Sequence, residues 1–299
     1  MKSLRIGCVK YLNARPLIHG WEGDVDFDHP SALCNKLATG KLDVALVSSF
    51  EFLRNPIYKI VDDVSISSDG AVYSVIVAHR GEIAEVEEIE LDPASETSRA
   101  LLRCLTAELG LEPRLIGNID LQSVRPVGFE PAVSAPIQPA ESQTAENISA
   151  GQTGNMPIFP AARRARLLIG DQAIRFRQAY ANEFSFWDLG EQWRKLVRLP
   201  FVYALWLVRP EVTDPEQIAN RLRALRDENL AHLDHVIEDA VAGGPGQRKA
   251  IDREFLSRYY REHLRFRFGE KEKKGLRVFA DLCERRGLLP KRDLAFRVV

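Results

Sequence analysis

The sequence predicts an α/β protein built from two domains. The chain has 299 residues, and at about 150 residues per domain this length favours two. Apolar strands alternate with short helices, an order that is typical of α/β proteins with a largely parallel sheet. The hydrophobic fraction of 45% is ordinary for a globular protein and too high for general disorder.

The first 110 residues contain three predicted strands and three predicted helices. Apolar runs predict buried strands at residues 4–9, 42–47 and 72–78. Asn13 and Pro16 indicate the start of a helix, because Asn is a good cap and Pro is tolerated in the first turn. Ser31 and Gly40 mark the start and the end of the next helix. Apolar residues at helical spacing predict a third helix at 100–109.

Residues 122–161 have a different composition from the rest of the chain. They contain six Pro and many Ser, Ala, Gln and Gly, without a regular hydrophobic period. Such a segment buries too little apolar surface to offset its ordering entropy. We therefore expect a long, flexible insertion here.

The remaining chain begins with strands and ends with helices. Apolar runs predict strands at 165–170 and 201–208, with a short extended piece at 186–190. Helical spacing and intervening glycines predict helices at 172–180, 192–197, 214–227, 228–242, 247–268 and 270–286.

Charge and apolar content exclude several classes of protein. The 41 Lys and Arg nearly balance the 42 Asp and Glu, so the basic excess of a nucleic-acid binder is missing. The longest apolar run has eight residues, whereas a membrane span needs about 20. The N-terminus lacks the apolar stretch of a signal peptide. We expect a cytoplasmic protein that binds neither membranes nor nucleic acids.

The motifs of several enzyme classes are absent as well. The four cysteines are scattered and the six histidines show no metal-binding spacing, so we expect no metal site. Nucleophile-elbow, phosphate-loop and dinucleotide-binding motifs are also missing. These absences argue against serine hydrolases, P-loop enzymes and Rossmann dehydrogenases, and they leave open a lyase that needs no cofactor.

Small polar residues gather where predicted strands meet predicted helices. In open α/β sheets, ligands bind outside the carboxyl ends of the strands, and helix N-termini there attract anions. Two such junctions, near residues 13 and 95, would suit a small dicarboxylate held between two lobes. The candidate residues are Asn13, Ser48, Ser49, Ser74, Ser95, Thr97, Ser98 and Asp171.

Several longer segments together resemble one family, the chorismate dehydratases of the futalosine route to menaquinone. The resemblance covers nearly the whole chain except residues 122–161. The segments that carry it are YLNARPL (11–17), PSALCNKLATGKLDVALVSSFEF (30–52), SISSDGAVYSV (65–75), LDPASETSRALL (91–102), LLIGDQAI (167–174), DLGEQW (188–193), LPFVYALWLV (199–208) and the C-terminal segment 255–289.

This resemblance implies a two-lobed fold of the periplasmic-binding-protein-like type II class, with the ligand cleft between the lobes. We expect lobe one to hold residues 1–80 and 203–299, and lobe two to hold 88–200. The two crossings between lobes are then expected at residues 78–90 and 200–204.

The resemblance also implies an activity, the dehydration of chorismate to 3-(1-carboxyvinyloxy)benzoate without a metal or cofactor. Asn13 and Ser74 are the implied catalytic residues. The implied substrate-binding residues are Ser48, Ser49, Ser95, Thr97, Ser98 and Asp171. Two alternatives remain open: a non-catalytic binding protein for small carboxylates with the same fold, and the later lyase of the pathway that forms a dihydroxynaphthoate.

Two positions depart from the family pattern. Lys10 stands where the family commonly has a small residue, and Glu96 stands where it usually has Arg. A glutamate directed into the cleft would repel a dianion. We therefore expect Glu96 to point outward, or to pair with Arg99 or another arginine.

Overall fold

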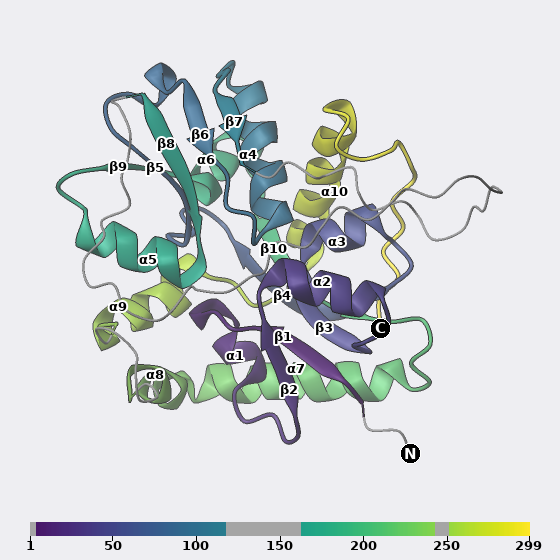
Figure 1. Cartoon of the computed structure of the whole chain (residues 1–299). Helices are drawn as coiled ribbons and strands as arrows, with labels where there is room; N and C mark the ends of the chain where they lie inside the picture. The colour runs from purple at the N-terminus through teal and green to yellow at the C-terminus, as the bar shows by residue number, and fades with distance from the viewer. Residues whose placement is uncertain (1–3, 118–162, 243–250) are drawn as a thin grey trace, which may run out of the picture.

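Two five-stranded sheets organise the protein (Figure 1). The computed structural model describes residues 4–117, 163–242 and 251–299. The predicted insertion at 122–161 lies outside these residues. Helices pack on each sheet, so each sheet with its helices forms one lobe, and the α/β class is confirmed.

The first lobe has the strand order β2-β1-β3-β10-β4. Its strands are β1 (Ile6–Val9), β2 (Val25–Asp28), β3 (Val44–Ser48), β4 (Lys59–Ser68) and β10 (Phe201–Val208). Its short helices are η1 (Leu12–Ala14), α1 (Arg15–Ile18), α2 (Pro30–Ala38) and α3 (Ser49–Arg54). The long helix α7 (Pro215–Ala231) packs on α1 and β4, and α8 (Leu233–Ala242) and α9 (Arg253–Arg258) follow it.

The second lobe has the strand order β7-β6-β8-β5-β9. Its strands are β5 (Val75–His79), β6 (Glu88–Glu90), β7 (Arg114–Ile116), β8 (Arg164–Ile169) and β9 (Ser185–Asp188). Its helices are η2 (Ile83–Glu85), α4 (Glu96–Glu108), α5 (Gly170–Ala179) and α6 (Leu189–Val197). Figure 1 shows this lobe above the first.

Both sheets are mixed: in each, four strands run in one direction, as expected for a largely parallel sheet, and one strand runs against them. In the first sheet β10 runs antiparallel to β3 and β4, and in the second sheet β5 runs antiparallel to β8 and β9. The pairs β1–β2, β1–β3, β6–β7 and β6–β8 are parallel. Each antiparallel strand is the first one that the chain reaches after changing lobes, and it therefore enters its sheet from the cleft.

The predicted position of the first crossing is wrong. The strand β5, which we expected in a first lobe ending at residue 80, pairs with β8 and β9 of the second sheet. The chain therefore changes lobes at residues 69–74 and not at 78–90. The second crossing ends at Pro200, since Phe201 already pairs with Ser68 of β4.

The prediction of a helix over 247–268 is also wrong for the last part of that range. After α9 come a π-helix, η3 (Tyr259–His263), and an extended segment. Leu264, Phe266 and Phe268 are buried while the two arginines between them are exposed. That alternation is the period of a strand, and Arg265 exchanges backbone hydrogen bonds with Ser67 of β4.

The last helix, α10 (Glu270–Arg285), packs against both β10 and α4 and so contacts both lobes. It also lies on the second crossing. A Cβ atom at Gly275 would stand 2.1 Å from the carbonyl oxygen of Pro200. Only glycine permits this close approach of the helix to the crossing.

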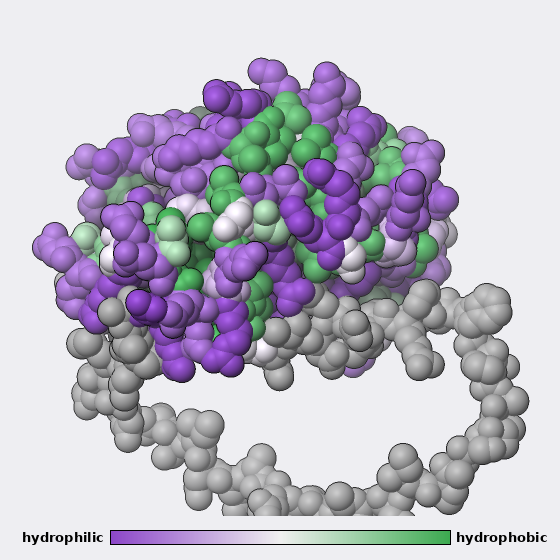
Figure 2. All heavy atoms as spheres, turned by 90° about the horizontal axis from the view of Figure 1, so that it is seen from above, coloured by the Kyte–Doolittle hydropathy of each residue, from purple (hydrophilic) through white to green (hydrophobic). Residues whose placement is uncertain are grey.

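Hydrophilic side chains cover most of the face seen in Figure 2, and apolar side chains appear between them in small areas. Within residues 4–117, 163–242 and 251–299, no helix has the length and apolar character that a bilayer span requires.

Candidate functional site

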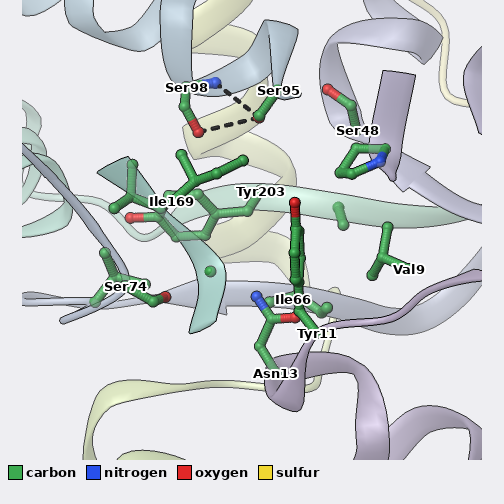
Figure 3. Close-up of a pocket in the computed structure, with 15 residues that line it drawn as sticks. Val9, Tyr11, Asn13, Ser48, Ile66, Ser74, Ser95, Ser98, Ile169 and Tyr203 are labelled. Carbon is green, nitrogen blue, oxygen red and sulfur yellow. Dashed lines mark hydrogen bonds between the residues drawn. The ribbon is translucent and has the colours of Figure 1, made fainter. Parts of the chain in front are cut away.

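A pocket with about 510 Å³ of empty space lies between the two sheets. The carboxyl ends of β1, β3 and β8 meet there, together with the amino ends of β5 and α4. Figure 3 shows Ser95 and Ser98 on one side of it and Asn13 on the opposite side. The prediction that ligands bind where strands meet helices is thus matched by a pocket in that place.

The structure divides the eight predicted site residues into two groups. Five of them line the pocket: Asn13, Ser48, Ser74, Ser95 and Ser98. The other three, Ser49, Thr97 and Asp171, are absent from its lining and make hydrogen bonds to the protein. We call the first group the pocket residues.

Asn13 lies in η1, the turn that follows β1, and its amide is directed toward the pocket in Figure 3. Its Oδ1 atom is buried and has no hydrogen-bond partner among the described residues. A buried polar atom left unpaired costs about 1–3 kcal/mol. A bound molecule that carries a hydroxyl group would satisfy it.

Ser74 lies at the end of the first crossing, directly before β5. It is fully buried, and its Oγ atom accepts a hydrogen bond of 2.8 Å from the hydroxyl of Tyr259. The residue before it, Tyr73, has a φ of 67°, a conformation that non-glycine residues rarely adopt. Asp188 accepts hydrogen bonds from the backbone N–H groups of Val72 and Tyr73 at 3.0 and 2.7 Å, and these hold the segment in place.

Ser95 and Ser98 lie at the N-terminus of α4, a helix of 13 residues. Ser95 caps the helix by accepting a hydrogen bond from the N–H of Ser98, and the two hydroxyl groups are 3.0 Å apart. The free N–H groups and the dipole of a helix N-terminus attract anions. This end of the pocket is therefore suited to a carboxylate.

Thr97 joins the lobes instead of facing the pocket. Its Oγ1 atom bonds with the hydroxyl of Ser48 and accepts a hydrogen bond of 3.0 Å from the N–H of Phe50. The Ser49 hydroxyl lies 3.4 Å from the same atom and donates to the carbonyl of Val202. This network fixes the N-terminus of α4 against the end of β3.

Asp171 joins the lobes at a second point. Its Oδ1 atom accepts a hydrogen bond of 2.9 Å from the N–H of Leu12 in η1. Burial raises the pKa of Asp171, while this hydrogen bond lowers it. The preceding residue, Gly170, has a φ of +58°, and a Cβ atom there would stand 3.0 Å from the ring of Tyr11.

Glu96 is turned away from the pocket, as we expected. Its carboxylate pairs with Arg54 of the first lobe at 2.8 Å and lies 3.9 Å from Arg99. Arg54 also pairs with the buried Glu51. The prediction that an arginine compensates Glu96 is confirmed, with Arg54 as its nearer partner.

The residues that line the pocket but were not singled out by the sequence analysis include Tyr11, Gly170 and Tyr203. Tyr11 and Gly170 are neighbours of predicted candidates within YLNARPL and LLIGDQAI, so extending each candidate to its adjoining residues would have found them. Burial and the charges of Asp92 and Asp171 raise the pKa of Tyr11, so its phenol stays protonated and can donate.

The described pocket lining contains no Lys, Arg, His, Asp, Glu or Cys side chain. Within the described ranges, one group of possible metal ligands occurs elsewhere, at His19, His235 and Asp239, whose ligand atoms lie within 4.8 Å of one another. His19 and Asp239 form an ion pair at 3.5 Å. The pocket itself can offer hydroxyl, amide and backbone hydrogen bonds beside the rings of Tyr11 and Tyr203.

Several solved structures have a similar fold. Protein AF1704 of Archaeoglobus fulgidus is 16% identical, with a TM-score of 0.64 over 96% of this chain and 98% of that chain. The Candida albicans CA3427 gene product, which has the generic periplasmic binding protein fold, is 11% identical, with a TM-score of 0.57 over 98% and 92%. The Escherichia coli sulphonate-binding protein SsuA is 13% identical, with a TM-score of 0.55 over 96% and 94%. The predicted fold class is confirmed.

Sequence comparison identifies the family. A curated chorismate dehydratase of Thermus thermophilus is 28% identical over 302 aligned residues, which cover 94% of this chain and 95% of that protein. The profile of a family described as menaquinone biosynthesis matches residues 4–122 and 147–285, most of the chain. The protein belongs to this menaquinone biosynthesis family.

Proposed function

We propose that this protein is a cytoplasmic hydro-lyase that dehydrates chorismate to 3-(1-carboxyvinyloxy)benzoate, within the futalosine route to menaquinone. The observation that carries the proposal is a pocket of neutral hydrogen-bond donors between two lobes, in a member of the menaquinone biosynthesis family. The similarity to the Thermus thermophilus enzyme along nearly the full length supports the choice of reaction.

The reaction requires little from the enzyme beyond binding and electrostatic stabilisation. Chorismate loses the proton on its ether-bearing carbon and the neighbouring hydroxyl, and the ring becomes aromatic. The ring carboxylate is conjugated with the reacting carbon and takes up the charge that the departing proton leaves. Preorganised donors stabilise such a charge effectively in a site that excludes water.

Ser95, Ser98 and the N-terminus of α4 would hold one carboxylate of the substrate. Their hydroxyl groups face the pocket and the helix dipole favours a negative group at this end. Ser48, at the end of β3 beside the N-terminus of α4, would add a further hydroxyl group. Neutral donors bind the dianion without placing a cation in the pocket.

Asn13 and Ser74 would act on the reacting carbons. The unpaired amide oxygen of Asn13 can accept the hydrogen of the departing hydroxyl, and its amide N–H can donate to the oxygen as it leaves. Ser74 can donate a hydrogen bond to an oxygen that gains negative charge. Both contributions increase in the transition state, which is where binding accelerates a reaction.

The proton has no acceptor among the titratable side chains of the described pocket lining. Burial keeps the pKa of Tyr11 and of Tyr203 above the ordinary value, so neither phenol serves as a base near neutral pH. The carboxylate of the enolpyruvyl group, attached next to the reacting carbon, is then the base. The substrate would supply its own general base, and the proton that this carboxylate takes up would pass to the departing hydroxide, which leaves as water.

The contacts of Thr97 and Asp171 support closure of the lobes around this substrate. Each joins one lobe to the other at the edge of the pocket. Closure of this kind removes water and fixes the substrate for reaction.

Purified protein incubated with chorismate tests the proposal against its two alternatives. The dehydratase produces an aromatic product with the mass of chorismate less one water. A binding protein gives heat of binding in calorimetry and returns chorismate unchanged. The later lyase of the pathway leaves chorismate unchanged as well, and shows no binding of it.

A further inference from the structure

The π-helix η3, Tyr259–His263, contacts both segments that carry the candidate catalytic residues. The hydroxyl of Tyr260 donates to the carbonyl of Leu12, beside Asn13, at 2.9 Å. His263 Nδ1 lies 2.9 Å from the carbonyl of Ala71 in the first crossing. Single π turns occur frequently at functional sites. This one contacts two segments that contribute residues to the pocket, those of Asn13 and Ser74.

The third contact of η3 reaches Ser74 itself. The hydroxyl of Tyr259 donates to Ser74 Oγ at 2.8 Å, and both side chains are fully buried. Burial raises the pKa of Tyr259 well above its ordinary value, so the phenol keeps its proton and acts as the donor. The direction of this hydrogen bond decides what Ser74 can do.

A serine hydroxyl that accepts one hydrogen bond still has its own hydrogen to donate. Among the described residues, Ser74 has Tyr259 as its side-chain partner and no protein acceptor for that hydrogen. Ser74 lines the pocket. The hydrogen of the Ser74 hydroxyl is therefore available to a molecule that binds in the pocket.

Several contacts also fix the backbone next to Ser74. Tyr73, at a φ of 67°, is fixed by the carboxylate of Asp188, by the ring of Phe255 at 4.8 Å and by the guanidinium of Arg177 at 4.2 Å. A backbone in this rare conformation persists only where surrounding contacts determine it. These contacts fix the Cα atom of Ser74, and Tyr259 fixes its hydroxyl.

We propose that Tyr259 is a positioning residue, which orients the Ser74 hydroxyl as a hydrogen-bond donor toward the substrate oxygen that gains negative charge. Tyr259 itself does not line the pocket. A chain of hydrogen bonds also polarises its members, so the Tyr259 donor strengthens Ser74 as a donor. This inference rests on the proposed function, because it assigns Ser74 a task in the elimination.

The variant Tyr259→Phe removes the hydroxyl and keeps the ring that stacks on Phe255. With chorismate as substrate, we expect kcat to fall about 10-fold, as for the loss of one hydrogen bond in the transition state, and KM to change less than threefold. Tyr58→Phe is the matched control. Tyr58 is another fully buried tyrosine, whose hydroxyl donates to Glu51 outside the pocket, and we expect its kcat to be unchanged.

A double-mutant cycle shows whether Tyr259 acts through Ser74. We expect Ser74→Ala to lower kcat about 100-fold, and Ser74→Ala with Tyr259→Phe to be no slower than Ser74→Ala alone. Independent losses, about 1000-fold together, would overturn the inference, and so would full kcat in Tyr259→Phe. A wild-type protein that leaves chorismate unchanged would instead contradict the proposed function, and the inference would fall with it.

Discussion

The pocket and the contacts between the lobes use the same kinds of residue for different purposes. In the pocket, Asn13 has an unpaired Oδ1 atom and Ser74 has a hydrogen without a described protein acceptor. At the lobe contacts, Thr97 and Asp171 have hydrogen-bond partners in the opposite lobe. Free hydrogen-bonding capacity therefore distinguishes Asn13 and Ser74 from Thr97 and Asp171, whereas Ser48 both lines the pocket and bonds Thr97.

The difference also explains why the pocket is neutral while charges lie just outside it. Arg54, Glu51 and Glu96 form a cluster of ion pairs, and none of the three lines the pocket. Charges paired with each other remain paired whether or not a dianion binds. The neutral donors of the pocket keep their capacity for the substrate.

The largest effect is expected for Asn13→Ala, which removes the unpaired amide from the pocket. We expect kcat with chorismate to fall at least about 100-fold, with a melting temperature near that of the wild type, because the amide oxygen bonds no described residue. Steady-state kinetics and thermal unfolding check this. Wild-type kcat would remove Asn13 from the catalytic residues.

A smaller effect is expected for Thr97→Val, which removes one side-chain contact between the lobes and replaces no residue of the pocket lining. We expect KM to rise about 10-fold, with kcat within about threefold of the wild type, since an unpaired buried N–H at Phe50 costs about 1–3 kcal/mol. Thr106→Val is the control on the same helix. Its hydroxyl is buried too and donates to the carbonyl of Leu102 within α4. If Thr97→Val lowered kcat and left KM unchanged, Thr97 would act in the reaction, as the pocket residues do, and not in joining the lobes.

Glu96→Gln should affect stability more than catalysis. The substitution leaves Arg54 with Glu51 as its remaining charged partner, and we expect a loss of about 1 kcal/mol in the free energy of unfolding. Glu191→Gln, which breaks the exposed pair with Lys195, should cost less. Urea denaturation measures both. A fall in kcat of more than about threefold would show that Glu96 takes part in the reaction.

The pH dependence of kcat should be nearly flat between about pH 6 and pH 9. The described pocket lining has no residue that titrates there, because burial raises the pKa of Tyr11 and the phenol stays protonated as the pH rises. A protein histidine acting as base would instead give a rate that falls below its pKa, near 6.5. Such a fall in the pH–rate profile would contradict a base supplied by the substrate.

Much of the fold could be predicted because its strands are apolar and its helices carry caps. The segments around β1, β3, β8 and β10 were located this way. The strand β4 was missed because Asp62 and Asp63 interrupt its apolar pattern. In the structure Lys273 pairs with Asp62, and Arg226 pairs with Asp63. Those partners lie more than 160 residues away in the chain, so no local sequence pattern predicts these ion pairs.

The assignment of β5 to a lobe shows a second limit. The apolar pattern of residues 72–78 predicts a strand but does not indicate which sheet that strand joins. The pairing with β8 and β9 places β5 in the second sheet. The candidate site has the same limit. Ser48 and Ser49 are adjacent and equally polar, yet one lines the pocket and the other bonds the carbonyl of Val202. The direction of each side chain depends on tertiary contacts.

The most direct test of the account is the conversion of chorismate by the wild type, Asn13→Ala and Thr97→Val at saturating substrate. Product is followed by absorbance and by mass. The account predicts an aromatic product of one dehydration from the wild type, near-wild-type turnover in Thr97→Val and a loss of at least about 100-fold in Asn13→Ala. Binding of chorismate without any product, or equal turnover in all three proteins, would contradict it.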